Sequence, residues 1–166
     1  HLAAVADVKD VFIEPSYAES INVRGTINVL EAARREKIKR IIYGSTTWVY
    51  NEIETEKVDE STSLQAPSHL YTATKLAGEY YCQTYSKLYD MNITCLRLFT
   101  VYGPRGRPEM APYKFTKLIN EEKDLPMFGD GHSKRDYTYV SDIVAGIVSS
   151  VDKDFKFEII NLGNSK

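Results

Sequence analysis

The sequence predicts an α/β fold built around a parallel, doubly wound sheet. The main observation is that windows with apolar residues at helical spacing alternate with short runs rich in β-branched residues. Some of these runs are apolar without interruption, which is typical of strands buried on both faces by helices. A length of 166 residues with 43% hydrophobic and 27% charged content suffices for one domain with its own core.

A long helix is expected first, over residues 17–37, because Ile21, Val29 and Leu30 fall on one helical stripe. A later helix is expected to begin with Ser141 as its N-cap and Asp142 in its first turn. The other expected elements are strand 39–43, helix 68–89, strand 92–99, helix 111–120 and strand 156–161. Residues 103–112 contain three prolines and two glycines, which predicts irregular backbone.

Charge and cysteine content argue against several classes of partner. The 21 Lys and Arg residues against 23 Asp and Glu give a net charge of -2, and no polybasic run favours nucleic acid or an anionic membrane. Cys82 and Cys95 lack the spacing of zinc ligands, so we expect neither a metal site nor a disulfide framework. No apolar stretch approaches the ~20 residues of a membrane-spanning helix. We expect a protein of the reducing cytoplasm.

The beginning of the chain lacks two features. His1-Leu2-Ala3-Ala4 has neither a Met nor the basic flank of a signal peptide, so we expect the chain to begin partway through a larger protein. A dinucleotide-binding sheet opens with a strand, a G-x-G-x-x-G turn and a helix. No such turn occurs, since Gly129-Asp130-Gly131 lacks the third glycine. We therefore interpret the chain as the later part of a Rossmann-like unit.

The strongest local signal for chemistry is the Y-x-x-x-K spacing of Tyr71 and Lys75 within an expected helix. Positions four apart share one helix face. A phenol with a pKa near 10 is a poor base at neutral pH, but an ammonium one turn away favours the phenolate. Tyr71 is therefore a candidate acid/base and Lys75 its partner. The spacing alone also fits a chance pair on a solvated face.

Three hydroxyl residues, Ser45, Thr46 and Thr47, follow the expected strand 39–43. Open parallel sheets bind ligands at the carboxyl ends of their strands. The hydroxyls stand one connection before Tyr71, so a hydroxyl and the phenol can converge on one substrate oxygen. They also fit a simple turn cap.

Five segments, in order, resemble a known family: HLAA, YGSTTWVY, YTATK, LRLFTVYGPRGRP and RDYTYVSDI. They resemble the landmarks of the extended short-chain dehydrogenase/reductases, in particular the nucleotide-sugar epimerases, and most of all the branch that acts on UDP-glucuronate. The resemblance implies that residues 1–103 are the later part of an NAD(P)-binding Rossmann domain. Residues 104–166 would be substrate-binding lid segments interleaved with returning Rossmann elements, the start of a smaller C-terminal substrate-binding domain. The family's glycine turn and carboxyl-terminal end are missing.

The resemblance also implies a catalytic set. Tyr71 would be the catalytic tyrosine, and Lys75 would bond the nicotinamide ribose. Thr46 matches the family's Ser/Thr because it stands three residues before Val49, as in the family's Ser-x-x-Val-Tyr-Gly motif. Asn51 replaces that glycine, and Asn tolerates positive φ better than most residues.

Binding residues are implied in the same way. The cofactor would be NAD, with NADP left open, and its further contacts would be Ala3, Ala4 and Asn22. The candidate substrate-binding residues are Thr47, Thr100, Arg107 and Arg135. A guanidinium at position 107 can bind the C5 carboxylate of a sugar acid through paired hydrogen bonds. Arg135 resembles the family's diphosphate-binding arginine. Either arginine also fits a merely solvated side chain.

The implied reaction is C4 epimerisation of a UDP-sugar through a transient 4-keto intermediate, with UDP-glucuronate giving UDP-galacturonate. The dehydratase branch has Asp-Glu after the catalytic threonine, where this chain has Thr47 and Trp48. UDP-glucose 4-epimerisation and an inactive nicotinamide-binding homologue or fragment stay open as alternatives. The resemblance also implies a homodimer through helices 17–37 and 68–89.

Overall fold

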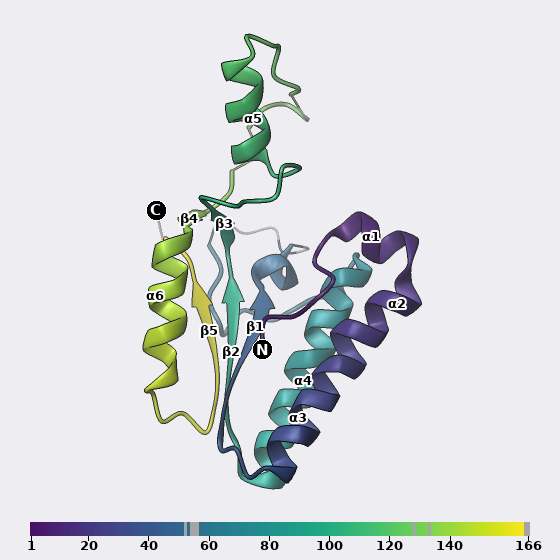
Figure 1. Ribbon diagram of the computed structural model, residues 1–166, viewed down its shortest axis with the longest axis vertical. Helices are drawn as coiled ribbons and strands as arrows, with labels where there is room; N and C mark the ends of the chain where they lie inside the picture. Colours follow the sequence, from purple (N-terminus) through teal and green to yellow (C-terminus); the bar gives the residue numbers. More distant parts are fainter. Residues whose placement is uncertain (52, 54–56, 128, 133, 165–166) are drawn as a thin grey trace.

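Three parallel strands form the central sheet of the structure, a computed structural model in which residues 1–51, 53, 57–127, 129–132 and 134–164 are described. Strands β1 (Arg40–Thr46), β2 (Asn92–Leu98) and β5 (Phe157–Leu162) lie in the order β1-β2-β5 (Figure 1). Both pairings are parallel, so the carboxyl ends of the strands meet at one edge. The predicted α/β class with a parallel sheet is confirmed.

Helices pack on both faces of this sheet, because successive side chains of a strand point to opposite sides. On one face, the Tyr43 hydroxyl of β1 donates a hydrogen bond to the Lys75 carbonyl of α4 (Leu70–Tyr89) at 3.4 Å. On the other face, Arg40 of β1 donates one to the Ser150 carbonyl of α6 (Val140–Val151) at 2.6 Å. This is the doubly wound arrangement that the sequence predicts.

The apolar core lies between the sheet, α4 and the helix α3 (Gly25–Arg35). Its buried residues are Leu30, Ala33, Ile41, Tyr43, Cys82, Met91, Ile93 and Cys95. Gly78 of α4 lies so close to Tyr43 that a Cβ at this position would be 2.1 Å from the phenol oxygen. A larger residue at Gly78 would push α4 away from β1 and would displace the catalytic candidates carried by this helix.

The helix predicted over residues 17–37 is present but differs in detail. It consists of α2 (Pro15–Glu19), the π-helical turn η1 (Ser20–Arg24) and α3, which follow one another alongside α4 (Figure 1). A short helix that the sequence analysis did not predict, α1 (Val8–Ile13), precedes them. Asp7 is its N-cap, and the Asp7 carboxylate accepts a hydrogen bond from the Lys9 N–H at 2.8 Å.

Two element boundaries correct the sequence-based expectations. β1 continues to Thr46, so the hydroxyl cluster begins inside the strand and not after it. α6 begins at Val140 with Tyr139 as its N-cap, so Ser141 lies within the helix and does not cap it. The reason is a short strand, β4 (Tyr137–Tyr139), which leads straight into the helix.

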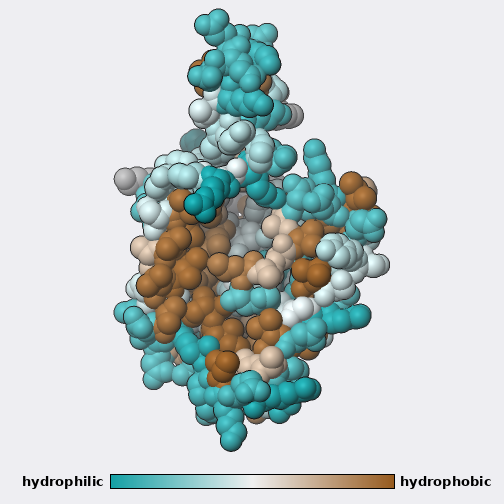
Figure 2. Space-filling view, viewed as in Figure 1, coloured by the Kyte–Doolittle hydropathy of each residue, from teal (hydrophilic) through white to brown (hydrophobic). Residues whose placement is uncertain are grey.

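The segment between two short strands protrudes from the sheet. Strand β3 (Thr100–Tyr102) pairs in parallel with β4, and between them the chain forms α5 (Ala111–Asn120). Residues 103–110 adopt neither helix nor strand, as predicted, but Ala111 and Pro112, the last two residues of the predicted irregular segment 103–112, begin α5. α5 stands apart from the sheet (Figure 1), and its surface is mostly hydrophilic, whereas a hydrophobic area lies beside and on α6 (Figure 2).

Candidate active site

The carboxyl ends of β1 and β2 border a cavity of about 620 Å³. Thr46 at the end of β1 and Tyr71 in the first turn of α4 both line it. Residues 102–107, at and after the end of β3, form another part of the wall. The cavity therefore lies where open parallel sheets bind their ligands.

Tyr71 and Thr46 meet in this cavity. Burial raises the pKa of the Tyr71 phenol above its ordinary value, while an interaction with the Thr46 hydroxyl and the charge of Arg107 act to lower it. Thr46 is only 6% exposed, and its hydroxyl also accepts a hydrogen bond from the Trp48 N–H at 3.2 Å. That bond caps the 3-10 turn η2 (Thr47–Tyr50), so Thr46 is both a turn cap and a neighbour of the phenol.

Lys75 lies one turn after Tyr71 and is 5% exposed. Burial lowers the pKa of Lys75 to about 8, although nearby Cys82 and Glu79 act to raise it. Its ammonium lies 4.8 Å from the centroid of the Tyr43 ring, and no described residue accepts a hydrogen bond from it. We expected this ammonium to lower the pKa of the phenol, but the groups that do so are Thr46 and Arg107.

A buried ion pair lies behind this cluster. Glu79 of α4 accepts two hydrogen bonds from Arg97 of β2, at 2.9 and 2.7 Å, and their side chains are 5% and 3% exposed. Glu79 also accepts a hydrogen bond from Ser45, and Arg97 donates one to the Tyr50 hydroxyl at 2.7 Å. The network joins β1, β2, α4 and η2, which are the elements that carry the catalytic candidates.

The predicted substrate residues Arg107 and Thr100 also line the cavity. Arg107 forms an ion pair with Asp7 at 3.4 Å, and its side chain is 47% exposed. Of the described residues, five that line this cavity are charged, three of them basic and two acidic: Asp7, Lys9, Arg105, Arg107 and Glu109. The excess of basic groups suits an anionic ligand.

Two other predicted substrate residues do not line this cavity. Thr47 donates a hydrogen bond to the Leu98 carbonyl at 3.1 Å. Arg135 is exposed, and its guanidinium donates to the Lys134 carbonyl at 2.9 Å. In this structure both side chains are bonded to main-chain carbonyls.

Asn22 occupies the interior instead of a cleft wall. It is 1% exposed, and its side-chain amide bonds the N–H and the carbonyl of Val5, at 2.7 and 3.0 Å, and the Thr74 hydroxyl at 3.0 Å. Asn22 thereby holds the segment that carries Ala3 and Ala4 against α4. Ala3 is exposed and Ala4 half-buried.

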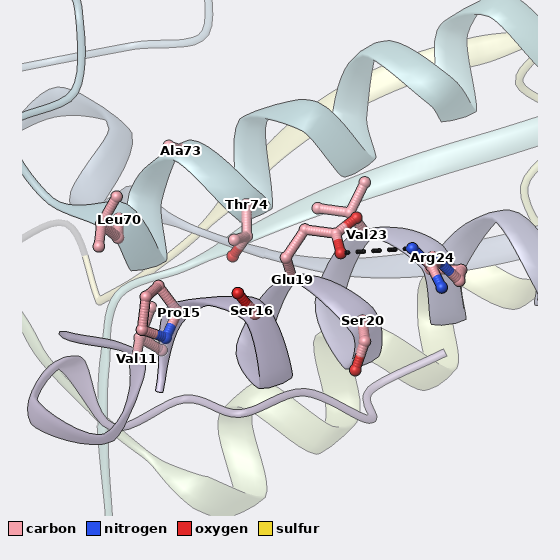
Figure 3. Close-up of a pocket in the computed structure, with 10 residues that line it drawn as sticks. All are labelled: Val11, Pro15, Ser16, Glu19, Ser20, Val23, Arg24, Leu70, Ala73 and Thr74. Atoms are coloured by element: carbon pink, nitrogen blue, oxygen red, sulfur yellow. Dashed lines mark ion pairs between the residues drawn. The ribbon is translucent and has the colours of Figure 1, made fainter. Parts of the chain in front are cut away.

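A second cavity, of about 680 Å³, opens between α2, η1 and the first turns of α4 (Figure 3). Glu19 and Arg24 form an ion pair at its edge, with 3.9 Å between the charged atoms. Tyr71 does not line it, whereas Tyr71 lines the cavity at the strand ends. We therefore place the chemistry at the strand ends.

Comparison with known proteins decides the family. Residues 1–163 match the family described as NAD dependent epimerase/dehydratase. The chain belongs to this family. Its resemblance to the extended short-chain dehydrogenase/reductase epimerases is thus confirmed. The cavity lined by Tyr71, Thr46 and Arg107 therefore lies in an epimerase/dehydratase fold.

Individual relatives of this epimerase/dehydratase chain differ in substrate. A UDP-glucuronate 4-epimerase of Thermodesulfobacterium geofontis is 40% identical over 100% of this chain and 51% of its own length. The UDP-glucuronic acid 4-epimerase from Bacillus cereus, solved with UDP-glucuronic acid and NAD, has a TM-score of 0.89 at 36% identity, over 99% of this chain and 52% of that one. A UDP-N-acetylglucosamine 4-epimerase from Methanobrevibacter ruminantium has a TM-score of 0.93 at 29% identity, over 100% and 54%.

The chain spans about half the length of the curated relatives it matches. The family assignment therefore concerns the fold and the part of the site described above. Among the residues that the structure describes, no helix has the length and apolar character needed to cross a bilayer.

The sequence analysis missed the buried ion pair, although two signals point to it. Glu79 follows Lys75 by four residues, as Lys75 follows Tyr71, so all three share one helix face. Arg97 is the charged residue of a strand whose other residues are neutral, and a charge buried in a strand requires a partner. The sequence analysis also missed Asp7, which lines the cavity and forms the ion pair with Arg107.

Proposed function

We propose that the chain carries the acid/base half of a UDP-sugar 4-epimerase that uses bound NAD to interconvert UDP-glucuronate and UDP-galacturonate. The observation that carries the proposal is the meeting of Tyr71, Thr46 and Arg107 around one cavity. The relatives that are 4-epimerases support the reaction class. UDP-glucose is the second candidate substrate.

Tyr71 is the group placed to move the proton of the sugar 4-hydroxyl. Its phenol lines the cavity and interacts with the Thr46 hydroxyl, so both can bond one sugar oxygen. Tyr71 would take this proton as C4 becomes a ketone and return it when C4 is reduced from the opposite face. Positioned acid/base catalysis of this kind is worth about 10² to 10⁴ in rate.

The residues next to Tyr71 fit a nicotinamide cofactor. The Lys75 ammonium is buried and has no acceptor among the described residues, so it can donate to a ribose hydroxyl. Ala3 and Ala4 are small residues near the end of β1, since the His1 carbonyl accepts a hydrogen bond from Gly44 of that strand at 3.0 Å. When bound, the nicotinamide supplies the hydride acceptor and donor for C4. NADP stays open.

Arg107 favours a sugar acid. Its guanidinium has five N–H donors in a planar fork, which match the two oxygens of a carboxylate. It lines the cavity together with Tyr71 and Thr100, so a carboxylate at C5 and a hydroxyl at C4 of one sugar can reach both groups. A neutral hydroxymethyl group offers the guanidinium no such pair of charged oxygens.

A homodimer and a cytoplasmic location stay predictions. The faces of α2 and α4 carry exposed apolar side chains, among them Tyr17, Tyr80 and Leu88, which are 60%, 64% and 65% exposed. A second copy of the protein packed on these helices would cover them. Sedimentation of the full-length protein at micromolar concentration should give a dimer, and a monomer alone would contradict this part of the proposal.

The proposed function is tested by incubating the full-length protein with NAD and either UDP-glucuronate or UDP-glucose, and resolving the sugar products. We expect UDP-galacturonate from the first substrate and little or no UDP-galactose from the second. Conversion of UDP-glucose alone would support the second candidate. No conversion of either substrate would contradict the proposal.

A further inference from the structure

Asp7 reaches the cavity from a part of the chain far from Arg107. Asp7 is the N-cap of α1, and one of its carboxylate oxygens accepts a hydrogen bond from the Lys9 N–H. The other oxygen lies 3.4 Å from the Arg107 guanidinium, across 100 positions of sequence. The cap therefore fixes the carboxylate and leaves its second oxygen for the arginine.

This contact is weak in its geometry. It is a single long contact between side chains that are 30% and 47% exposed. The only other hydrogen bond of the guanidinium among the described residues is to the Met110 sulfur at 3.6 Å. Exposed ion pairs contribute about 0.2 to 1 kcal/mol. The Arg107 guanidinium thus contacts Asp7 but keeps N–H donors without acceptors among the described residues. A substrate carboxylate that binds through both oxygens can therefore displace Asp7 from Arg107.

We propose that Asp7 is a specificity-determining residue that competes with the substrate carboxylate for Arg107. The inference rests on the proposed function, because it requires a substrate with a carboxylate at C5. Asp7 neutralises the charge of Arg107 when no sugar acid is bound. Neutral UDP-sugars can then bind without leaving the Arg107 charge unpaired. A sugar acid must displace Asp7 and bind within reach of its negative charge, so Asp7 weakens binding of UDP-glucuronate relative to UDP-glucose.

The test is the substitution Asp7→Asn in the full-length protein with bound NAD. Asn caps helices about as well as Asp, so α1 keeps its N-cap while the competing charge is removed. We expect the ratio of kcat/KM for UDP-glucuronate to that for UDP-glucose to rise about three- to ten-fold, mainly through KM, as loss of an exposed pair and of like-charge repulsion implies.

Two further variants isolate the cause. Asp10→Asn removes the same charge from α1 at a residue that does not line the cavity, and it should leave the ratio within about two-fold of wild type. In an Arg107→Ala background, Asp7→Asn should raise the ratio less than it does in wild type, because the competition for Arg107 is absent and only the repulsion between Asp7 and the substrate carboxylate remains.

The outcomes separate the inference from the proposed function. Wild type that forms UDP-galacturonate, with a ratio that Asp7→Asn leaves unchanged or lowers, would overturn the role of Asp7 alone. An equal rise for Asp10→Asn would reduce the effect to net charge and would also overturn it. Wild type that does not convert UDP-glucuronate would overturn the proposed function, and the inference with it.

Discussion

Two ion pairs near the cavity differ in burial, geometry and connections. Glu79 and Arg97 are 5% and 3% exposed and share two hydrogen bonds, at 2.9 and 2.7 Å. Asp7 and Arg107 are 30% and 47% exposed and share one contact at 3.4 Å. The first pair joins strands and a helix of the sheet layer, whereas the second joins a helix cap to an irregular loop.

The difference separates two tasks. Tyr71, which we propose moves the proton, and its neighbour Thr46 lie on α4 and β1, which the buried pair fixes in place. The group that would select the substrate, Arg107, lies on an irregular loop and contacts Asp7 at 3.4 Å and the Met110 sulfur at 3.6 Å. Precise geometry matters most for the chemical step, and rigid elements provide it better than loops do.

The largest expected effect concerns the chemical step. Tyr71→Phe should lower kcat by at least about 100-fold with little change in substrate affinity, because positioned acid/base catalysis is worth about 10² to 10⁴. Steady-state kinetics of the full-length protein measure it. Tyr80→Phe is the matched control, since Tyr80 lies on the same helix, is 64% exposed and does not line the cavity. Near-normal turnover by Tyr71→Phe would remove the catalytic assignment.

Breaking the buried pair of Glu79 and Arg97 should lower the free energy of unfolding more than breaking the exposed pair of Asp7 and Arg107 does. Glu79→Leu leaves Arg97 buried without its partner, which we expect to lower the free energy of unfolding by about 3 to 5 kcal/mol. Adding Arg97→Met should recover most of this loss, because no uncompensated charge remains. Asp7→Ala and Arg107→Ala should each change stability by only about 1 kcal/mol. Urea unfolding measures all four, and equal losses at the two pairs would contradict the comparison.

Selectivity should depend on the exposed pair. Arg107→Ala should lower kcat/KM for UDP-glucuronate, because the substrate carboxylate loses its partner. The decrease should correspond to a loss of about 2 to 4 kcal/mol of transition-state stabilisation. UDP-glucose, which has no carboxylate, should lose much less. Equal losses for both substrates would mean that Arg107 only supports the loop.

Replacing Lys75 should change stability less than breaking the buried pair does, and in the opposite direction. Lys75→Met removes a buried ammonium and should raise the free energy of unfolding at pH 7 by about 1 to 3 kcal/mol, without added NAD, while impairing turnover. The pKa of Lys75 is lowered from 10.5 to about 8, so the unfolded chain binds more protons between these values. Wild-type stability should therefore rise with pH across this interval and approach that of the variant. A constant difference from pH 7 to 10.5 would contradict the lowered pKa.

The sequence predicted the layers of the fold because strand and helix patterns are local. The boundaries were less predictable, since Ser141 has the residue type of a cap but β4 runs directly into α6. The Y-x-x-x-K spacing predicted Tyr71 and Lys75 on one helix face, and the structure brings Thr46 to the phenol. No local pattern could predict the Asp7 and Arg107 contact, because it joins residues 100 positions apart.

We propose that the protein inverts C4 of a UDP-sugar by removing and returning the same hydride while Tyr71 moves the hydroxyl proton. The most direct test is to incubate the full-length protein and NAD with UDP-glucuronate that carries deuterium at C4, in ordinary water. We expect UDP-galacturonate that retains the deuterium at C4. A product that has exchanged this deuterium with water, or one inverted at another carbon, would contradict it.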